Sequence, residues 1–418
     1  MKCSCSRREF LARGLYGIGL GAGLPVFLSR TSAALTAQAL QGTSMEKHPE
    51  RILVVLELSG GNDGLNTVVP HGDPAYYRAR PHIGIPAREV LKVDDHFGFH
   101  PSMVGFERLY KDGRMAIVHG CGYDHPSLSH FSSMSYWHTG VPNAGESLGW
   151  LGRLADDHLD PATRNLIVNI GTSQSLAVRS GKHSPLVFDD PARFRRDGND
   201  AEKRVLAGFG SEHTQPSANA TLDFLSATAR NAADSSDFVR QASAAYRTPV
   251  DYGIGNAFGG GLQRVAALIA AGMKTRLYYV SYQGNAFDTH VQQGDVHSRL
   301  LMYTADAVRA FLDDVARLGR GDDVAVMMFT EFGRRVEENG SLGTDHGTAG
   351  PMFLFGKQDR IKAGQYGQPP SLTDLDDGNL KMTTDFRCVY ATAIKEWLGY
   401  DDTDTILKGR FDSLAAFA

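Results

Sequence analysis

Cysteine is scarce in this sequence. The 418-residue chain has four cysteines, Cys3, Cys5, Cys121 and Cys388. No two of them form a CxxC pair, which excludes the usual thiolate zinc and dithiol redox motifs. Cys121 and Cys388 could pair in an oxidising compartment or could remain small buried apolar side chains. The sequence leaves both interpretations open.

Long apolar runs and basic clusters are also missing. No internal stretch reaches the roughly 18 apolar residues that a membrane span needs. The formal net charge is -4 and no long Lys/Arg run is present, which argues against nucleic-acid binding. Apolar residues make up 42% and charged residues 22%, as in ordinary folded domains. We therefore expect a globular protein with no nucleic-acid partner and no transmembrane span.

The N-terminus has a different character from the rest of the chain. Arg7 and Arg8 are followed by Phe10 and Leu11, a mildly apolar glycine-rich stretch and small residues suited to cleavage. A buried helix is the alternative, but each glycine would destabilise it by about 1 kcal/mol. The pattern predicts a twin-arginine export signal over residues 1–37. It implies passage through the twin-arginine translocation machinery to a periplasmic or extracellular location.

Six short apolar runs rich in β-forming residues predict strands. Most are nearly continuous rather than alternating, which is typical of strands covered on both faces of a parallel sheet. Helical patterns precede several of them, and this alternation predicts a three-layer α/β/α fold around a mostly parallel sheet. The runs are Ile52–Gly60, Met115–Gly120, Leu166–Gly171, Arg276–Tyr282, Val324–Thr330 and Pro351–Gly356.

The domain organisation is predicted from a change of composition in the middle of the chain. Residues 188–247 are polar, rich in Ala, Ser, Asp and Arg, and have helical spacing. We interpret this region as a helical cap or insertion within one domain that covers residues 51–418.

Polar side chains collect beside the ends of five predicted strands. In open α/β sheets, ligands bind beyond the carboxyl ends of the strands. Each group alone has a simpler explanation, such as a turn residue at Asp63 or a helix cap at Ser129. Together, carboxylates and imidazoles predict a site for one or two divalent ions, among Zn, Mn, Ca and Mg. The candidates are Asn62, Asp63, Ser129, His130, Asp288, His290, Glu331, Arg334, Arg335, Asp345 and His346.

These residue types predict phosphoryl- or sulfuryl-transfer chemistry. Ser129 stands where a loop enters a predicted helix, whose N-terminus would stabilise an alkoxide or a bound oxyanion. A metal ion would lower the pKa of this hydroxyl or of a water nucleophile. Arg334, or Arg335 as the weaker candidate, could hold a phosphate or sulfate through two parallel hydrogen bonds. Asp345 is expected to orient His346.

Five motifs resemble the bacterial family catalogued as domain of unknown function 1501. They run in order from about Arg51 to Gly399. The motifs are LELSGGNDGLNTVVP, SLSHFSSMSYWHTG, FDTHVQQ, TEFGRRVEENGSLGTDHGTAGPMFLFG and TTDFRCVYATAIKEWLG. That family is grouped with the alkaline phosphatase-like superfamily of phosphatases, sulfatases and phosphoglycerate mutases. The resemblance implies an α/β/α fold with metals at the carboxyl edge of the sheet.

The resemblance also implies roles for individual residues. Asp63 matches the first metal-binding aspartate and Ser129 the nucleophile. Asp288 with His290 matches an Asp and His pair, although one residue separates them here instead of three. His346 matches the last histidine. Glu331 and Phe332 stand where the superfamily has an aspartate and a histidine, so a second metal site would lose an imidazole.

The expected activity is hydrolysis of phosphate or sulfate esters by an exported metal-dependent enzyme. We expect Ser129 and Arg334 to be catalytic, and an anionic ester, including a carbohydrate-linked one, to be the substrate. Two alternatives stay open: a non-enzymatic binding protein on the same fold, or a metal-dependent mutase or transferase. The expected metal ligands are Asp63, Asp288, His290, Glu331 and His346. The residues expected to contact substrate or orient ligands are Asn62, His130, Asp345 and Arg335.

Overall fold

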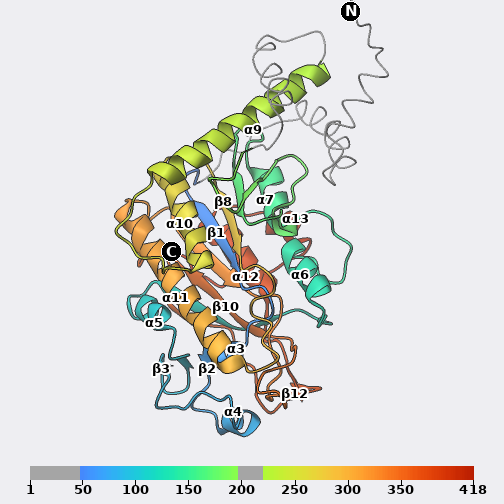
Figure 1. The fold of residues 1–418 in the computed structure, drawn as a ribbon. Helices are drawn as coiled ribbons and strands as arrows, with labels where there is room; N and C mark the ends of the chain where they lie inside the picture. Colours follow the sequence, from blue (N-terminus) through green and yellow to red (C-terminus); the bar gives the residue numbers. More distant parts are fainter. Residues whose placement is uncertain (1–47, 196–219) are drawn as a thin grey trace, which may run out of the picture.

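The computed structural model describes residues 48–195 and 220–418, which build a nine-stranded sheet between helices (Figure 1). The strand order is β11-β5-β10-β9-β1-β8-β6-β7, with β14 paired to β5. These strands are β1 Ile52–Glu57, β5 Met115–Gly122, β6 Ile167–Ile170, β7 Leu186–Phe188, β8 Leu277–Ser281, β9 Val324–Phe329, β10 Gly350–Phe355, β11 Gly364–Tyr366 and β14 Thr384–Asp385. All six predicted strands are confirmed.

One strand of this sheet runs against the others. β10 pairs antiparallel with both β5 and β9, whereas the remaining pairs are parallel. A parallel neighbour needs a crossover, usually a helix. The segment between β9 and β10 holds no helix, so the chain turns back on itself. The start of β10 therefore lies at the same edge as the carboxyl ends of the parallel strands.

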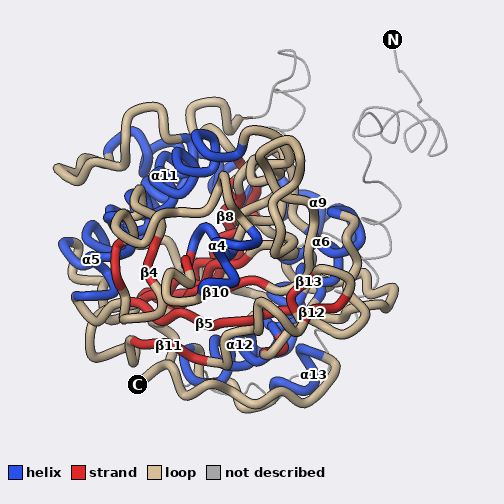
Figure 2. The backbone as a smooth tube through the Cα atoms, turned by 90° about the horizontal axis from the view of Figure 1, so that it is seen from below, coloured by secondary structure: helices blue, strands red, loops and turns tan. Residues whose placement is uncertain are grey.

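Apolar side chains of the central strands alternate between two separate cores. Ile52, Val54 and Leu56 of β1 pack in the core that α5, α10 and α11 cover. Leu53 and Val55 pack in the opposite core, under α6, α7 and α12. Figure 2 shows the strands between these two sets of helices. Both faces of the strands are thus buried, which explains their continuous apolar runs and confirms the predicted α/β/α architecture.

The helices and smaller strands complete the fold. The helices are α3 Gly64–Thr67, α4 Pro74–Ala79, α5 Val104–Lys111, α6 His130–Thr139, α7 Trp150–His158, α9 Ala220–Ala245, α10 Ala257–Ala270, α11 Gln293–Arg317, α12 Phe386–Thr392 and α13 Thr403–Leu407. Shorter turns are η1 Leu176–Val178 and the π-helical η2 Ala393–Trp397. Two small sheets contain β2 Val68–Val69, β3 Leu91–Lys92 and β4 Gly98–Phe99, and β12 Leu375–Asp376 and β13 Asn379–Leu380.

Two predicted segments fall wholly or partly outside the described residues. The export signal over residues 1–37 lies outside them and stays a prediction. The 26-residue helix α9 lies inside the range predicted as a helical cap, but residues 196–219 are not described. Within the described part, no helix combines the length and apolar character that a bilayer crossing requires.

Candidate metal centre

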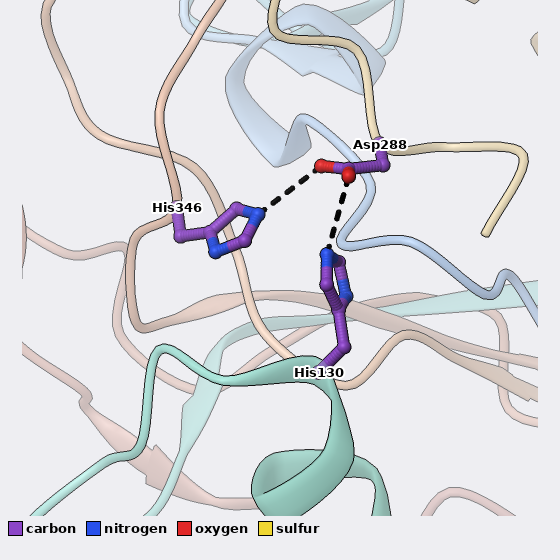
Figure 3. A group of neighbouring side chains, drawn as sticks. All are labelled: His130, Asp288 and His346. Atoms are coloured by element: carbon purple, nitrogen blue, oxygen red, sulfur yellow. Dashed lines mark hydrogen bonds and ion pairs between the residues drawn. The ribbon is translucent and has the colours of Figure 1, made fainter.

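Three segments that are distant in sequence meet at the carboxyl edge of the sheet. His130 is the first residue of α6, after β5. Asp288 and His290 lie in the loop between β8 and α11, and His346 precedes β10. Figure 3 shows His130 and His346 each pointing toward a different oxygen of the Asp288 carboxylate. The parallel strands and the reversed β10 together bring these segments to one place.

The inner nitrogens of three histidines converge on Asp288. His130 Nε2 lies 3.3 Å from Asp288 Oδ2, and His346 Nε2 lies 3.1 Å from Oδ1. His290 Nε2 lies 3.0 Å from Asp288 Oδ1 and 3.0 Å from His346 Nε2. Possible ligand atoms of His130, Asp288 and His346 all lie within 4.8 Å of one another. This set combines imidazole nitrogens with a carboxylate.

The outer nitrogens of these histidines each contact a group that can only accept. His130 Nδ1 lies 2.8 Å from Glu331 Oε1, and His346 Nδ1 lies 2.8 Å from the Leu128 carbonyl oxygen. His290 Nδ1 lies 3.2 Å from Asp345 Oδ1, so Asp345 holds His290 and not His346 as expected. An ionised carboxylate or a carbonyl accepts only, so each Nδ1 carries the proton and donates it. In the neutral rings, each Nε2 then turns a lone pair toward Asp288.

A cation fits this arrangement. Lone pairs facing a carboxylate repel it unless a proton or a metal ion lies between them. His130 Nε2 is buried and lies 3.3 Å from Asp288 Oδ2 without the geometry of a hydrogen bond. Each histidine Nε2 lies 3.0–3.3 Å from an Asp288 oxygen, close to the about 3.0–3.4 Å between neighbouring ligands around an ion bound at about 2.1 Å. A carboxylate or carbonyl holding the far nitrogen of a ligating histidine is also the usual arrangement around metals.

Charge at the site is set by the neighbours of each group. Burial would raise the pKa of Asp288, but its contacts with the Arg334 guanidinium and with His346 outweigh burial and lower the pKa to about 2. The hydrogen bond to Glu331 raises the pKa of His130. Burial lowers the pKa of His346. Asp288 is therefore ionised at neutral pH and available as a ligand.

Glu331 lies behind His130 and does not face the cluster. Its carboxylate accepts hydrogen bonds from the Gly60 and Gly61 amides at 2.9–3.1 Å and from the Thr330 hydroxyl at 3.1 Å. Its side chain is fully buried. The predicted role of Glu331 as a ligand does not fit this geometry, because its oxygens are already held. It orients His130 instead.

Arg334 is buried rather than open to a substrate. Its guanidinium donates to the carbonyl oxygens of Gly60, Gly61, Phe287 and Thr344 and to Asp288 Oδ1 at 2.8 Å. These bonds tie together the loops that follow β1, β8 and β9. The expectation that Arg334 holds an anionic substrate does not fit this arrangement. Arg335 is partly exposed, and its guanidinium lies 3.5 Å from Asp377.

Asp63 and Asn62 lie deeper in the protein than expected. Asp63 is fully buried and pairs with Arg80 at 2.6 Å and with Gln293 at 2.7 Å. Although burial alone would raise it, the pKa of Asp63 is lowered to about 2, chiefly by Arg80. Asn62 Oδ1 lies 2.9 Å from His297 Nε2. The structure does not bring these two side chains to the histidine cluster, because buried partners occupy them.

Ser129 caps α6 by position but not by contact. It directly precedes His130, and its side chain makes no capping hydrogen bond. The residue is exposed. Its neighbours Leu128 and His130 both take part in the cluster. Ser129 therefore lies at a helix start beside the cluster, where the nucleophile was predicted. Its catalytic role stays a prediction.

Phe332 forms an apolar wall of the site. Its ring lies 4.9 Å from that of His130 and 4.6 Å from that of His346, measured between centroids. The residue is only 2% exposed. A Cβ on Gly61, at φ +75°, would lie 2.3 Å from the Phe332 ring, so glycine is required there. The position compared above with a histidine ligand of a second metal site therefore holds a buried aromatic ring, Phe332.

His130 takes a more central place in the cluster than the sequence predicted. It was expected to contact substrate or orient ligands, yet its Nε2 faces Asp288 directly. The sequence feature that indicates this role is the position of His130, next to Ser129 at the first turn of a helix that follows a strand. Of the five expected metal ligands, Asp288, His290 and His346 meet in the cluster, whereas Asp63 and Glu331 do not.

A family model described as "Protein of unknown function (DUF1501)" matches residues 50–406. The chain belongs to this family. The predicted family resemblance is therefore confirmed. No curated protein matches the sequence.

Several solved structures are distantly similar to this DUF1501 protein. A Vibrio parahaemolyticus protein in the alkaline phosphatase superfamily is 11% identical, with 89% of this chain and 70% of that chain covered, at a TM-score of 0.40. The lipoteichoic acid synthase LtaP from Listeria monocytogenes is 9% identical, with 90% and 80% covered, at 0.39. The PsFucS1 sulfatase from Pseudoalteromonas sp. is 12% identical, with 94% and 74% covered, at 0.37.

Proposed function

We propose that this protein is an exported metal-dependent hydrolase of phosphate or sulfate esters. The observation that supports it best is the convergence of three histidine Nε2 atoms on Asp288, with His130 Nε2 left without a hydrogen bond. Imidazole-rich sets suit Zn²⁺ and other transition metals, whereas Ca²⁺ and Mg²⁺ prefer oxygen ligands. We therefore favour a single Zn²⁺ or Mn²⁺ over the calcium and magnesium alternatives.

The residues would hold this ion and leave it open to solvent. When bound, a divalent ion polarises an ester oxygen and lowers the pKa of a water nucleophile. Glu331, Asp345 and the Leu128 carbonyl fix the three imidazole rings, and Arg334 fixes Asp288. The four cluster side chains are 21–38% exposed, so an ester can approach from solvent.

A transferase mechanism is the second candidate because of Ser129. Its exposed hydroxyl lies next in sequence to His130 and makes no capping hydrogen bond. In that mechanism, Ser129 Oγ would form a bond to phosphorus or sulfur as the ester oxygen leaves, and its proton would pass to solvent. Mass spectrometry of a trapped intermediate tests this. Full hydrolysis by Ser129→Ala would instead indicate direct attack by water.

Metal analysis combined with an activity screen tests the hydrolase proposal. We expect purified protein to hold one metal ion per chain and to hydrolyse aryl phosphates or aryl sulfates. His346→Ala should lose both the metal and the activity. His82→Ala is the matched control, because His82 is 69% exposed and pairs with Glu338. Unchanged metal content in His346→Ala would refute the site. Full metal loading without turnover on a broad ester panel would favour the non-enzymatic binding protein.

Export is tested separately from chemistry. Replacing both Arg7 and Arg8 with lysine keeps the charge but removes the paired arginines of the predicted signal. We expect the variant to accumulate in the cytoplasm, whereas the unaltered chain is recovered from the periplasm or medium. Equal export of both chains would show that residues 1–37 do not act as a twin-arginine signal.

A further inference from the structure

Exposed apolar side chains gather on the segments that hold the metal cluster. Of the eight large apolar side chains exposed among the described residues, four belong to these segments, so the clustering exceeds scattered surface exposure. They are Leu128 at 37%, Phe131 at 88%, Val291 at 63% and Leu342 at 37% exposed. We call these four residues the apolar rim.

Contacts place the rim residues beside the cluster. The Leu128 carbonyl accepts a hydrogen bond from His346 Nδ1. Phe131 follows His130 at the start of α6, and Val291 follows His290. The Leu342 carbonyl accepts from the Gln293 amide at 3.0 Å, which joins its loop to the segment after His290. Rim residues thus belong to each of the three chain segments that supply the cluster.

Phe131 is the member that most needs an explanation. Leaving most of an aromatic ring in water forgoes the stabilisation that burial provides. Ser133 and Trp137 of the same helix are buried, so α6 turns one face to the core and Phe131 lies off that face. An exposed aromatic ring at the first turn, next to a cluster residue, is suited to contact a ligand held at that cluster.

We propose that the site binds esters with an aromatic or alkyl group next to the anionic ester, and that Phe131 packs against this group with Leu128. The inference rests on the proposed metal-dependent function and names its substrate class. A cation at the cluster would attract the anionic end. The rim would bury the apolar end, which a purely hydrophilic ester would leave in water.

A binding experiment with non-hydrolysable analogues tests this proposal. The probes are 2-phenylethylphosphonate and 2-methoxyethylphosphonate, titrated calorimetrically into metal-loaded protein whose metal content is measured in parallel. We expect the phenylethyl compound to bind about tenfold more tightly, which is the gain in affinity expected from partly burying one apolar group. Phe131→Ala should abolish this preference, and Phe131→Tyr should retain it. Ile254→Ala is the matched control, since Ile254 is fully exposed and lies outside the rim.

The outcomes separate this inference from the proposed function. Equal affinity for both phosphonates, or an undiminished preference in Phe131→Ala, would overturn the rim proposal while leaving the metal site intact. Binding of neither phosphonate by metal-loaded protein would also overturn it. Purified protein that takes up no metal would refute the proposed function itself. Phe131-dependent binding of the protein to lipid vesicles, together with equal affinity for the two phosphonates, would show that the rim serves a membrane surface instead.

Discussion

Glu331 shows how one residue can support a site without entering it. Its buried carboxylate accepts hydrogen bonds from two backbone amides and a hydroxyl, which fix it in position. From there it holds the Nδ1 proton of His130 and leaves Nε2 directed at Asp288. The residue that was expected to bind a metal thus determines which nitrogen of its neighbour is available.

Replacement of Glu331 should weaken metal binding without removing a ligand. Glu331→Gln puts an NH₂ group where the Gly60 and Gly61 amides and His130 Nδ1 all donate to a carboxylate. At least one buried donor then has no acceptor, and the His130 tautomer is no longer fixed. We expect metal affinity to fall about 10–100-fold, the usual effect of losing an orienting partner. Competition with a chelator measures this. Asp345→Asn is the comparison and should have a smaller effect, because Asp345 is exposed at 56%. Unchanged affinity in a folded Glu331→Gln protein would contradict this role.

Helices α5 and α11 show how packing between elements supports the site. Helix α11 follows the loop that holds Asp288 and His290, and its first residue, Gln293, bonds to Asp63. Helix α5 packs closely against α11 at Gly105. A Cβ there would lie 2.4 Å from the Ala305 carbonyl oxygen, closer than real atoms approach. Only glycine allows this separation between the two helices.

Two glycine-to-alanine changes should therefore have opposite effects on stability. Gly105→Ala forces α5 away from α11, and overpacking of this kind costs about 1–3 kcal/mol. Gly260→Ala lies in α10, where a Cβ would meet only the end of Arg264 at 3.8 Å. There alanine should stabilise by about 0.5–1 kcal/mol through helix propensity. Denaturant unfolding measures both, and equal effects would contradict the packing argument.

Across the whole molecule, two buried histidines link stability to pH. Burial lowers the pKa of His297 to about 3 and that of His100 to about 4. Both are nearly inaccessible, at 1% and 6% exposed. The folded protein therefore keeps them neutral, whereas the unfolded chain protonates them near pH 6.5. Their contribution is complete above pH 6.5 and is lost as the pH falls toward 3–4.

The free energy of unfolding should accordingly decrease in mild acid. For His297 the decrease between pH 7 and pH 5 is about 2 kcal/mol, because only the unfolded state takes up a proton in this range. Urea unfolding at several pH values measures the slope. His297→Gln should remove this decrease of about 2 kcal/mol between pH 7 and pH 5, and its side-chain amide still supplies a hydrogen-bond donor for Asn62. An unchanged slope in this variant would show that His297 is not the group responsible.

The sequence by itself determined the strands, the sheet class and the edge where function was sought. Continuous apolar runs can be satisfied only by burial on both faces, and this local property needs no knowledge of distant contacts. The start of helix α12 is equally local, because the Asp385 side chain caps it by accepting from the Arg387 amide two residues later. The family could also be identified from the sequence, because its motifs are contiguous stretches of the chain.

Only the tertiary structure decided which polar residues meet. Asp63 and Glu331 look like ligands in the sequence, but Arg80 and the Gly60 and Gly61 amides bind their oxygens. His130 becomes a cluster member because Glu331 takes its outer nitrogen. Whether a carboxylate faces a cluster or a buried partner depends on side-chain orientation and on contacts hundreds of positions apart. Strand patterns record neither, so the order of the sheet and the packing of its loops determine the site.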